Sequence, residues 1–148
     1  KSVDRLKTLI ERRGIRNVVL CPVAAWSGKT LIRVFINDSH PASSFTEGTK
    51  KYSASRMECF HAVEMPADTI DNLLRERGID RVDLISITTN GAEKQILAGA
   101  NGTMQGGLRY VALARTGENY TQMMDALGYN LFGYDDRGFT FARREEKR

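Results

Sequence analysis

The apolar positions along this chain form two kinds of block, and each kind predicts a different element. Where apolar residues recur every three or four positions up to a glycine, the pattern predicts a helix. Where they run together or alternate over four to eight positions, it predicts a strand. The predicted helices span residues 2–14, 67–79, 91–100 and 119–128. The predicted strands span residues 17–23, 30–36, 60–65, 82–87, 108–115, 129–135 and 138–144.

Punctuating residues set the limits of several elements. Pro66 is expected to end the third strand, because proline cannot donate to a strand ladder. Asp68 is expected to cap the second helix and Gly78 to close it. The first two strands, on either side of the Ser27-Gly28 turn, are expected to pair as a hairpin or nearly so. The polar stretch 37–56 is long for a compact domain and predicts a functional or disordered loop.

The helices are expected to bury one side each. The inner positions are Val3, Leu6, Leu9 and Ile10, then Ile70, Leu73 and Leu74, then Ile96 and Leu97, then Tyr120, Met123, Met124 and Leu127. Strand and helix alternate through most of the chain. We therefore expect an α/β fold, with a mostly parallel sheet, helices on both faces and a C-terminal antiparallel hairpin.

Composition narrows the class of protein. The chain has 148 residues, which fits a single domain spanning 1–148, with 41% hydrophobic and 27% charged residues. No apolar run is long enough for a membrane span. The net charge is +4, but the basic residues are interleaved with acidic ones along the chain, so no nucleic-acid surface is expected. Cys21 and Cys59 form no metal-ligand pattern, so no metal is expected, and free thiols suit the cytoplasm.

Candidate chemistry gathers where strands end, since ligands of open α/β sheets bind outside the carboxyl ends of the strands. The stretch "TTNGAE", residues 88–93, leaves a strand and enters a helix. Its hydroxyl and amide groups meet the free N–H groups and positive dipole end of that helix. A purely structural role is the alternative: Asn90 caps the helix, and the negative charge of Glu93 interacts favourably with the positive end of the helix dipole.

The region around this tip resembles the FkbM-type methyltransferases. "TIDNLLRERGIDRVDLISITTNGAEKQILAGA" is similar to that family's T-L-D-x-L-L helix and its strand, Gly-Ala-Glu and helix signature. "LKTLIERRGIRNVVLCPVAAWSGKTLIRVFI", "HPASSF" and "ALGYNLF" resemble further parts of the family pattern, so the likeness covers nearly the whole chain. The Gly-Ala-Glu segment and the helix before it are the most specific part.

The resemblance implies a class I, Rossmann-like fold that binds S-adenosylmethionine and methylates a hydroxyl of a sugar, polyketide or glycolipid. It also implies a glycine-rich cofactor loop and an acidic ribose ligand ahead of the region that Lys1 begins. Neither is found in the chain, and its first residue is not Met. We therefore expect the C-terminal two-thirds of such a domain, with the N-terminal strands missing and the fragment itself inactive.

The chain departs from the family pattern at the tip. Where relatives carry Lys, Asp and Glu before Gly-Ala-Glu, it has Ser86, Thr88 and Asn90, and only Glu93, in the Gly-Ala-Glu segment itself, keeps its carboxylate. Threonine and asparagine can orient a hydroxyl acceptor, but neither is a useful base near neutral pH.

The predicted site has three parts. The expected catalytic residues are Thr88, Asn90, Glu93 and His40. The expected cofactor-binding residues are Ala24, Ala25, Trp26 and Thr88, since small residues leave room for a flat adenine and an indole can stack on it. The expected substrate-binding residues are Ser43, Ser44 and Arg115. Three of these residues have a simpler structural alternative: His40 as a solvated loop residue, Trp26 packed on the sheet edge, and Arg115 in a surface ion pair.

Two other functions compete with methyl transfer. A non-catalytic binding or partner module would explain the altered acids at Thr88 and Asn90. A phosphate-binding loop is disfavoured, because "SGKT" at 27–30 lacks the earlier glycine and joins two strands. The expected partner is a small-molecule or glycan hydroxyl acceptor.

Overall fold

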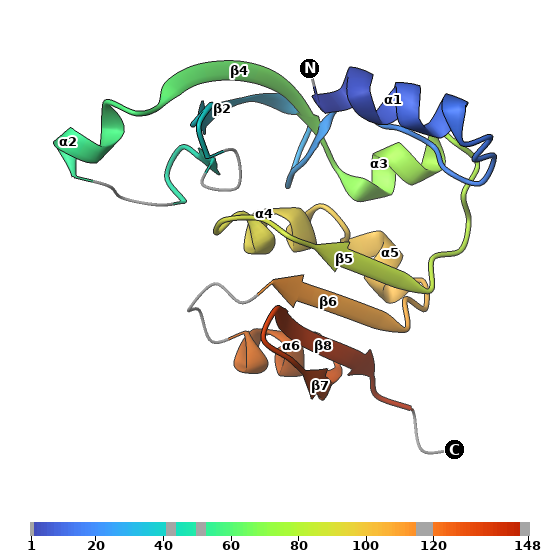
Figure 1. Ribbon diagram of the computed structural model, residues 1–148. Helices are drawn as coiled ribbons and strands as arrows, with labels where there is room; N and C mark the ends of the chain where they lie inside the picture. Colours follow the sequence, from blue (N-terminus) through green and yellow to red (C-terminus); the bar gives the residue numbers. More distant parts are fainter. Residues whose placement is uncertain (1, 41–43, 50–52, 115–119, 146–148) are drawn as a thin grey trace.

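The computed structural model describes residues 2–40, 44–49, 53–114 and 120–145. Within these ranges the chain forms two four-stranded sheets with helices around them (Figure 1). The α/β class expected from the sequence is confirmed at this level. The two sheets lie one above the other in Figure 1, and the candidate site lies between them.

The first sheet is built from the N-terminal half. Its strands are β1 (Ala24–Ala25), β2 (Thr30–Ile36), β3 (Phe45–Thr46) and β4 (His61–Asp68), in the order β1-β4-β2-β3. β2 matches its predicted range and pairs antiparallel with β4 along its whole length. β1 runs parallel to β4 through two residues only.

The predicted strand over 17–23 is wrong. Only Ala24 and Ala25 join the sheet, and they pair with β4 rather than with β2, so the expected hairpin is also wrong. Val18 and Val19 are 46% and 67% exposed. An apolar run predicts burial, but a strand also requires a neighbour with free backbone groups, and no described strand lies beside 17–23.

The second sheet is built from the C-terminal half. Its strands are β5 (Leu84–Ile87), β6 (Tyr110–Ala114), β7 (Tyr129–Tyr134) and β8 (Gly138–Arg143), in the order β5-β6-β8-β7. β5 and β6 are parallel and are connected through α4 (Glu93–Ala98) and α5 (Asn101–Gln105). β7 and β8 form the predicted antiparallel hairpin, with an irregularity between Leu131 and Gly133.

The expectation of a mostly parallel sheet is wrong for the described chain. Of its six strand pairings, only β1 with β4 and β5 with β6 are parallel. The reason lies in the connections. A parallel pair needs a long crossover, whereas the short links from β2 to β3 and from β7 to β8 fold the chain back on itself.

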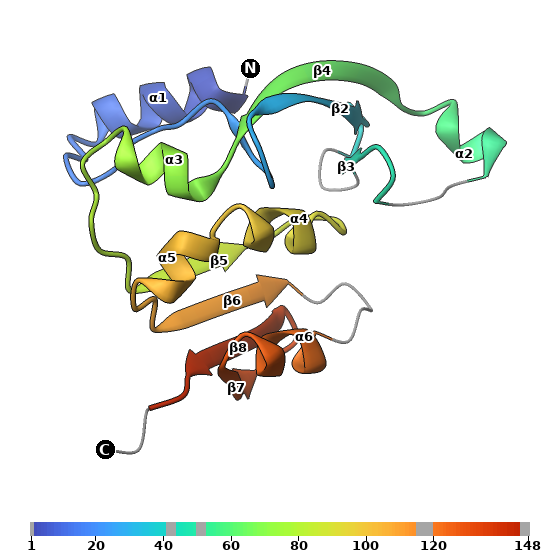
Figure 2. The same cartoon turned by 180° about the vertical axis from the view of Figure 1, so that it is seen from behind.

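Helices α4, α5 and α6 (Thr121–Ala126) lie on the same face of the second sheet (Figure 2). That face buries Ile85 and Ile87 to 8% and 4% exposure, whereas Leu84 on the opposite face is 53% exposed. The expected cover of helices on both faces is therefore not found for β5 in the described chain. On the N-terminal helix α1 (Ser2–Arg12) the inward orientation expected for Val3, Leu6 and Leu9 is also wrong, since they are 45%, 45% and 47% exposed.

The hydrophobic core belongs to the C-terminal half. Its buried members all come from residues 85–141: Ile85, Ile87, Ala92, Ile96, Leu97, Ala100, Met104, Leu108, Val111, Leu113, Tyr120, Met124, Tyr129 and Phe141. The inward positions predicted for Ile96, Leu97, Tyr120 and Met124 are confirmed, whereas Leu127 is 43% exposed. No helix in the described ranges is long and apolar enough to cross a bilayer.

The helix after β4 begins later than predicted. β4 continues through Pro66 to Asp68. Pro66 is paired with β2 on one side, and β1 reaches only Ala67 and Asp68 on the other. The strand therefore tolerates a residue without an N–H at position 66. Thr69, not Asp68, caps α3 (Ile70–Arg75): its hydroxyl accepts from the Asn72 N–H at 3.0 Å. Asp68 instead accepts from the Thr69 N–H and from the Asn72 side chain. The short helix α2 (Ala54–Met57) lies at the far end of the first sheet (Figure 1).

Candidate functional site

The tip at residues 88–92 joins the end of β5 to α4. Gly91 has a φ of +96°, a backbone conformation that side chains other than glycine rarely adopt. A Cβ added at Gly91 would lie 3.0 Å from the carbonyl oxygen of Thr49, so the tip also passes close to the turn after β3. Glycine is therefore required here both for conformation and for space.

Asn90 does not cap the helix, so that part of the structural reading is wrong. The N-cap position of α4 is Ala92, which makes no side-chain capping bond. The Asn90 amide nitrogen instead donates to the backbone oxygen of Ser44 at 2.8 Å. This bond joins the tip of the second sheet to the residue just before β3 of the first sheet, across 46 positions of sequence.

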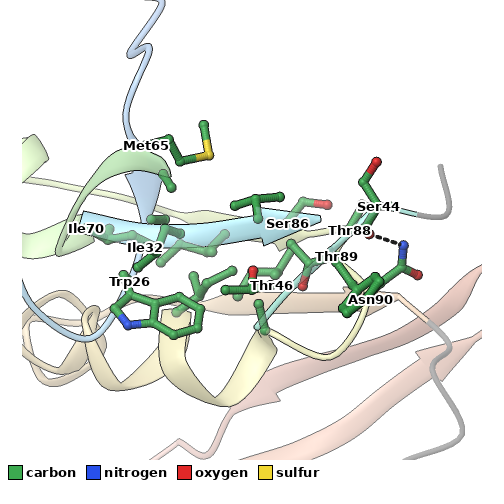
Figure 3. Close-up of a pocket in the computed structure, with 18 residues that line it drawn as sticks. Trp26, Ile32, Ser44, Thr46, Met65, Ile70, Ser86, Thr88, Thr89 and Asn90 are labelled. Atoms are coloured by element: carbon green, nitrogen blue, oxygen red, sulfur yellow. Dashed lines mark hydrogen bonds between the residues drawn. The ribbon is translucent and has the colours of Figure 1, made fainter. Parts of the chain in front are cut away.

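A cavity of about 490 Å³ opens between the two sheets at this tip (Figure 3). Its 18 lining residues come from both halves of the chain: Ala24, Ala25, Trp26, Ile32, Val34, Ser44, Phe45, Thr46, Met65, Ile70, Ile85, Ser86, Ile87, Thr88, Thr89, Asn90, Ala92 and Ile96. Six of the predicted site residues are therefore brought together: Ala24, Ala25, Trp26, Ser44, Thr88 and Asn90.

One part of the cavity wall is apolar and another part is polar. Aliphatic side chains, among them Ile32, Met65 and Ile70, line it on one side. The hydroxyl and amide groups lie near one another in the close-up: Thr88, Asn90 and Ser44. The arrangement is typical of small-molecule sites, which are mostly apolar with a few placed polar groups.

None of the described lining residues is ionisable. Threonine, serine and asparagine side chains donate and accept hydrogen bonds but do not take up a proton near neutral pH. The described wall can bind and orient a ligand by shape and hydrogen bonding. It supplies neither a general base nor a charge partner.

Glu93 lies in the interior of the protein rather than in the cavity wall. It is 0% exposed, and its two oxygens accept from the Thr89 hydroxyl at 2.8 Å and from the Tyr120 hydroxyl at 3.0 Å. Tyr120 is 2% exposed and stands at the start of α6. Glu93 therefore connects the tip, α4 and α6, and the structure places it behind Thr89 as a residue that holds the tip in position.

The sequence offered two roles for Trp26, in the cofactor site or packed on the sheet edge, and its position is compatible with both. It lines the cavity, and it also packs against the hydrophobic core. Its backbone is fixed on two sides: its N–H donates to the Asp68 oxygen at 2.8 Å, and its carbonyl oxygen lies against Gly99. A Cβ at Gly99 would overlap that oxygen.

The remaining predicted site residues lie elsewhere. His40 is exposed and does not line the cavity; its backbone N–H donates to the Asn37 side chain at 2.9 Å. This placement agrees with the plainer reading of His40 as a loop residue. Ser43 and Arg115 lie outside the described residues.

A second hollow, of about 760 Å³, was not foreseen from the sequence. It lies over the carboxyl end of β5 and β6 and the β7–β8 hairpin, and Ser86, Ile87 and Thr88 line both cavities. The exposed rings of Phe132 and Tyr134 border it. Their exposure is visible only once the hairpin is placed, since aromatic residues in a strand normally predict burial.

The described ranges hold no group of three or more His, Cys, Asp or Glu residues arranged to bind a metal ion. No family model, curated protein or solved structure matches the chain.

Proposed function

We propose that this chain is part of an S-adenosylmethionine-dependent O-methyltransferase, with the cavity between the sheets as its cofactor and acceptor site. The observation that carries the proposal is the convergence of Ala24–Trp26 with Thr88–Asn90, two segments far apart in sequence, on one cavity. In this proposal Ala24, Ala25, Trp26 and Thr88 contact the cofactor, and Thr88 and Asn90 orient the acceptor.

The cavity fits one part of the cofactor. Its volume lies in the range of small-molecule sites, and Trp26 beside two alanines offers a ring and open space for adenine. The described wall has no charged partner for the ribose or the amino-acid end. In the family that the sequence resembles, a glycine-rich turn and an acidic residue would supply those contacts.

The free edge of β5 supports an additional strand beside it. The Tyr110 N–H donates to the Asp83 oxygen at 3.0 Å, so alternation of the parallel ladder turns the backbone groups of Leu84 and Ser86 outward. β5 pairs only with β6 within the described residues. Such an edge, next to an apolar cavity, accommodates a further extended segment.

When bound, S-adenosylmethionine would supply an electrophilic methyl group. The chain's own residues would orient the acceptor: Thr88 and Asn90 offer hydroxyl and amide groups, and Glu93 fixes the tip through Thr89. Positioning of this kind accounts for a large part of many rate accelerations. Removal of the acceptor proton requires a base from outside the described wall.

The first test is calorimetric titration with S-adenosylmethionine, on this chain and on the protein extended upstream to its natural start. We expect micromolar binding by the extended protein and none by this chain. In the extended protein, Trp26→Ala should weaken binding about tenfold, since ring stacking contributes about 0.5–1.5 kcal/mol. Phe132→Ala, which removes an exposed ring that does not line this cavity, is the matched control.

A binding module without catalysis is the second candidate, and the absence of ionisable groups from the described wall favours it. Failure of the extended protein to bind the cofactor would contradict the methyltransferase proposal. Binding of the cofactor without transfer to any hydroxyl acceptor would favour the second candidate.

A further inference from the structure

The chain contains two Asn-Gly pairs, and the structure holds them differently. Asn90–Gly91 lies at the tip between β5 and α4, and Asn101–Gly102 begins α5. In such a pair the glycine nitrogen can attack the asparagine side-chain amide, because glycine has no side chain to obstruct the approach. The attack requires a glycine N–H that is not held as a donor, and it is hindered where the pair lies in a helix.

The Asn101–Gly102 pair is held by a carboxylate. The Gly102 N–H donates to Asp71 Oδ2 at 2.7 Å, and the next N–H, of Thr103, donates to Asp71 Oδ1 at 2.8 Å. Attack by the Gly102 nitrogen must first break a charge-assisted hydrogen bond and open the first turn of the helix. Asn101 is therefore exposed but chemically protected.

The Asn90–Gly91 pair lies outside any helix or strand. Gly91 has its φ at +96°, and its N–H makes no hydrogen bond to another residue in the described part of the chain. The bond from the Asn90 amide to the Ser44 oxygen restrains the side chain but leaves the nucleophile unengaged. Within the described residues, therefore, the Gly91 N–H is free of a hydrogen-bond acceptor, whereas the Gly102 N–H is not.

We propose that Asn90 is a site of spontaneous deamidation. The Gly91 nitrogen loses its proton and bonds to Cγ of Asn90, and the bond from Cγ to Nδ2 breaks as ammonia leaves. Water then opens the resulting five-membered ring at either carbonyl, which leaves aspartate or isoaspartate. One water is consumed, one ammonia is released, and nothing is oxidised or reduced.

The product changes both features that define the tip. The donor to the Ser44 oxygen is replaced by a carboxylate oxygen, so two acceptors face each other where a hydrogen bond joined the two sheets. The conversion also places a carboxylate in a cavity whose described wall has no ionisable group. Under the proposed function that carboxylate would be a base beside the acceptor, and this consequence alone rests on that function.

Tryptic digestion separates the two pairs, because residues 82–94 and 95–109 fall in different peptides. The full chain is incubated at mildly alkaline pH, and conversion of amide to acid in each peptide is followed by mass spectrometry. We expect Asn90 to convert at least about tenfold faster than Asn101, since the Gly102 N–H must first leave its carboxylate. Equal rates, a faster Asn101 or an unchanged 82–94 peptide would overturn the proposal.

Two variants control the comparison. Asn90→Gln should abolish conversion in the 82–94 peptide and leave the other unchanged. Asp71→Ala should accelerate Asn101 alone; acceleration in both peptides would show general unfolding, and an unchanged Asn101 rate would contradict the protection argument. All readouts are independent of S-adenosylmethionine, so failure of this proposal is distinguishable from failure of the proposed function.

Discussion

Glu93 is a buried carboxylate whose partners are two hydroxyl groups. Glu93→Ala would leave the hydroxyls of Thr89 and Tyr120 without their acceptor and open a small void. We expect the free energy of unfolding to fall by about 2–4 kcal/mol. Glu93→Gln keeps an oxygen for one hydroxyl and should cost about 1 kcal/mol.

Urea denaturation measures both Glu93 variants. Glu76→Ala is the matched control, since the Glu76 side chain is 53% exposed and its ion pair is with Arg77, the neighbouring residue at the surface. Its loss should stay within about 0.5 kcal/mol. If Glu93→Ala cost no more than this control, the positioning role of Glu93 would be wrong.

Gly99 is required by space alone, since its φ is −80°. A methyl group there would overlap the carbonyl oxygen of Trp26, which is backbone and cannot rotate away. We expect Gly99→Ala to destabilise the protein by about 1–3 kcal/mol through overpacking. Gly28→Ala, where an added Cβ meets nothing within 4 Å, should be neutral or stabilising by about 0.5 kcal/mol. Thermal unfolding of the pair tests this contrast, and equal melting temperatures would refute it.

Between elements, Asp71 connects α3 to the start of α5. Burial alone would raise the pKa of the Asp71 carboxyl, but hydrogen bonds from the Thr103 hydroxyl and from the Thr103 and Gly102 N–H groups outweigh it and lower that pKa. A lowered pKa means that the carboxylate stabilises the folded state above the unfolded pKa of about 3.9. This stability is lost as the pH falls through the folded pKa.

Asp71→Asn isolates that contribution. We expect it to lower the free energy of unfolding by about 1 kcal/mol at pH 7, as for the loss of a helix cap. The difference from the original protein should shrink below pH of about 4, as Asp71 becomes protonated. Urea midpoints of the two proteins across this pH range test the sign, and a difference that grew in acid would contradict it.

The elements that the sequence predicted well are those whose pattern is local. β2 and the β7–β8 hairpin depend on apolar residues and turns within a few positions, and both were predicted correctly. The strand predicted over 17–23 failed because a strand also depends on a distant neighbour. The start of α3 failed because Asp68 and Thr69 are both good caps, and only the packing of β4 decides between them.

At the scale of the molecule, the sequence predicted which segments lie around one cavity but not which of their side chains face it. The rule that ligands bind at strand ends indicated Ala24–Trp26 and Thr88–Asn90, and the structure places both in one wall. The same rule gave Glu93 a catalytic role, whereas its side chain lies behind the wall. Burial of a polar side chain depends on partners such as Tyr120, which follows 27 positions later and looked like an ordinary core residue.

The C-terminal half of the molecule buries more apolar side chains than the N-terminal half, and this difference predicts which sheet unfolds first. The core cluster comes wholly from residues 85–141, while residues before 70 contribute Ile32, Phe45 and Ala67 as buried hydrophobics in the described chain. Regions with few buried apolar contacts open at lower free energy than the core. The first sheet should therefore open while the second remains folded.

Native-state hydrogen exchange at increasing urea tests this order. We expect amides of β6 and β8, beside the fully buried Val111 and Phe141, to exchange only through global unfolding. Amides of β2 and β4 should show an opening free energy at least about 2 kcal/mol lower. Gly99→Ala, which disturbs the contact of Trp26 with the second half, should lower the first-sheet values further, whereas Gly28→Ala should not. One common opening free energy for both sheets would instead show that the cavity lies inside a single cooperative unit.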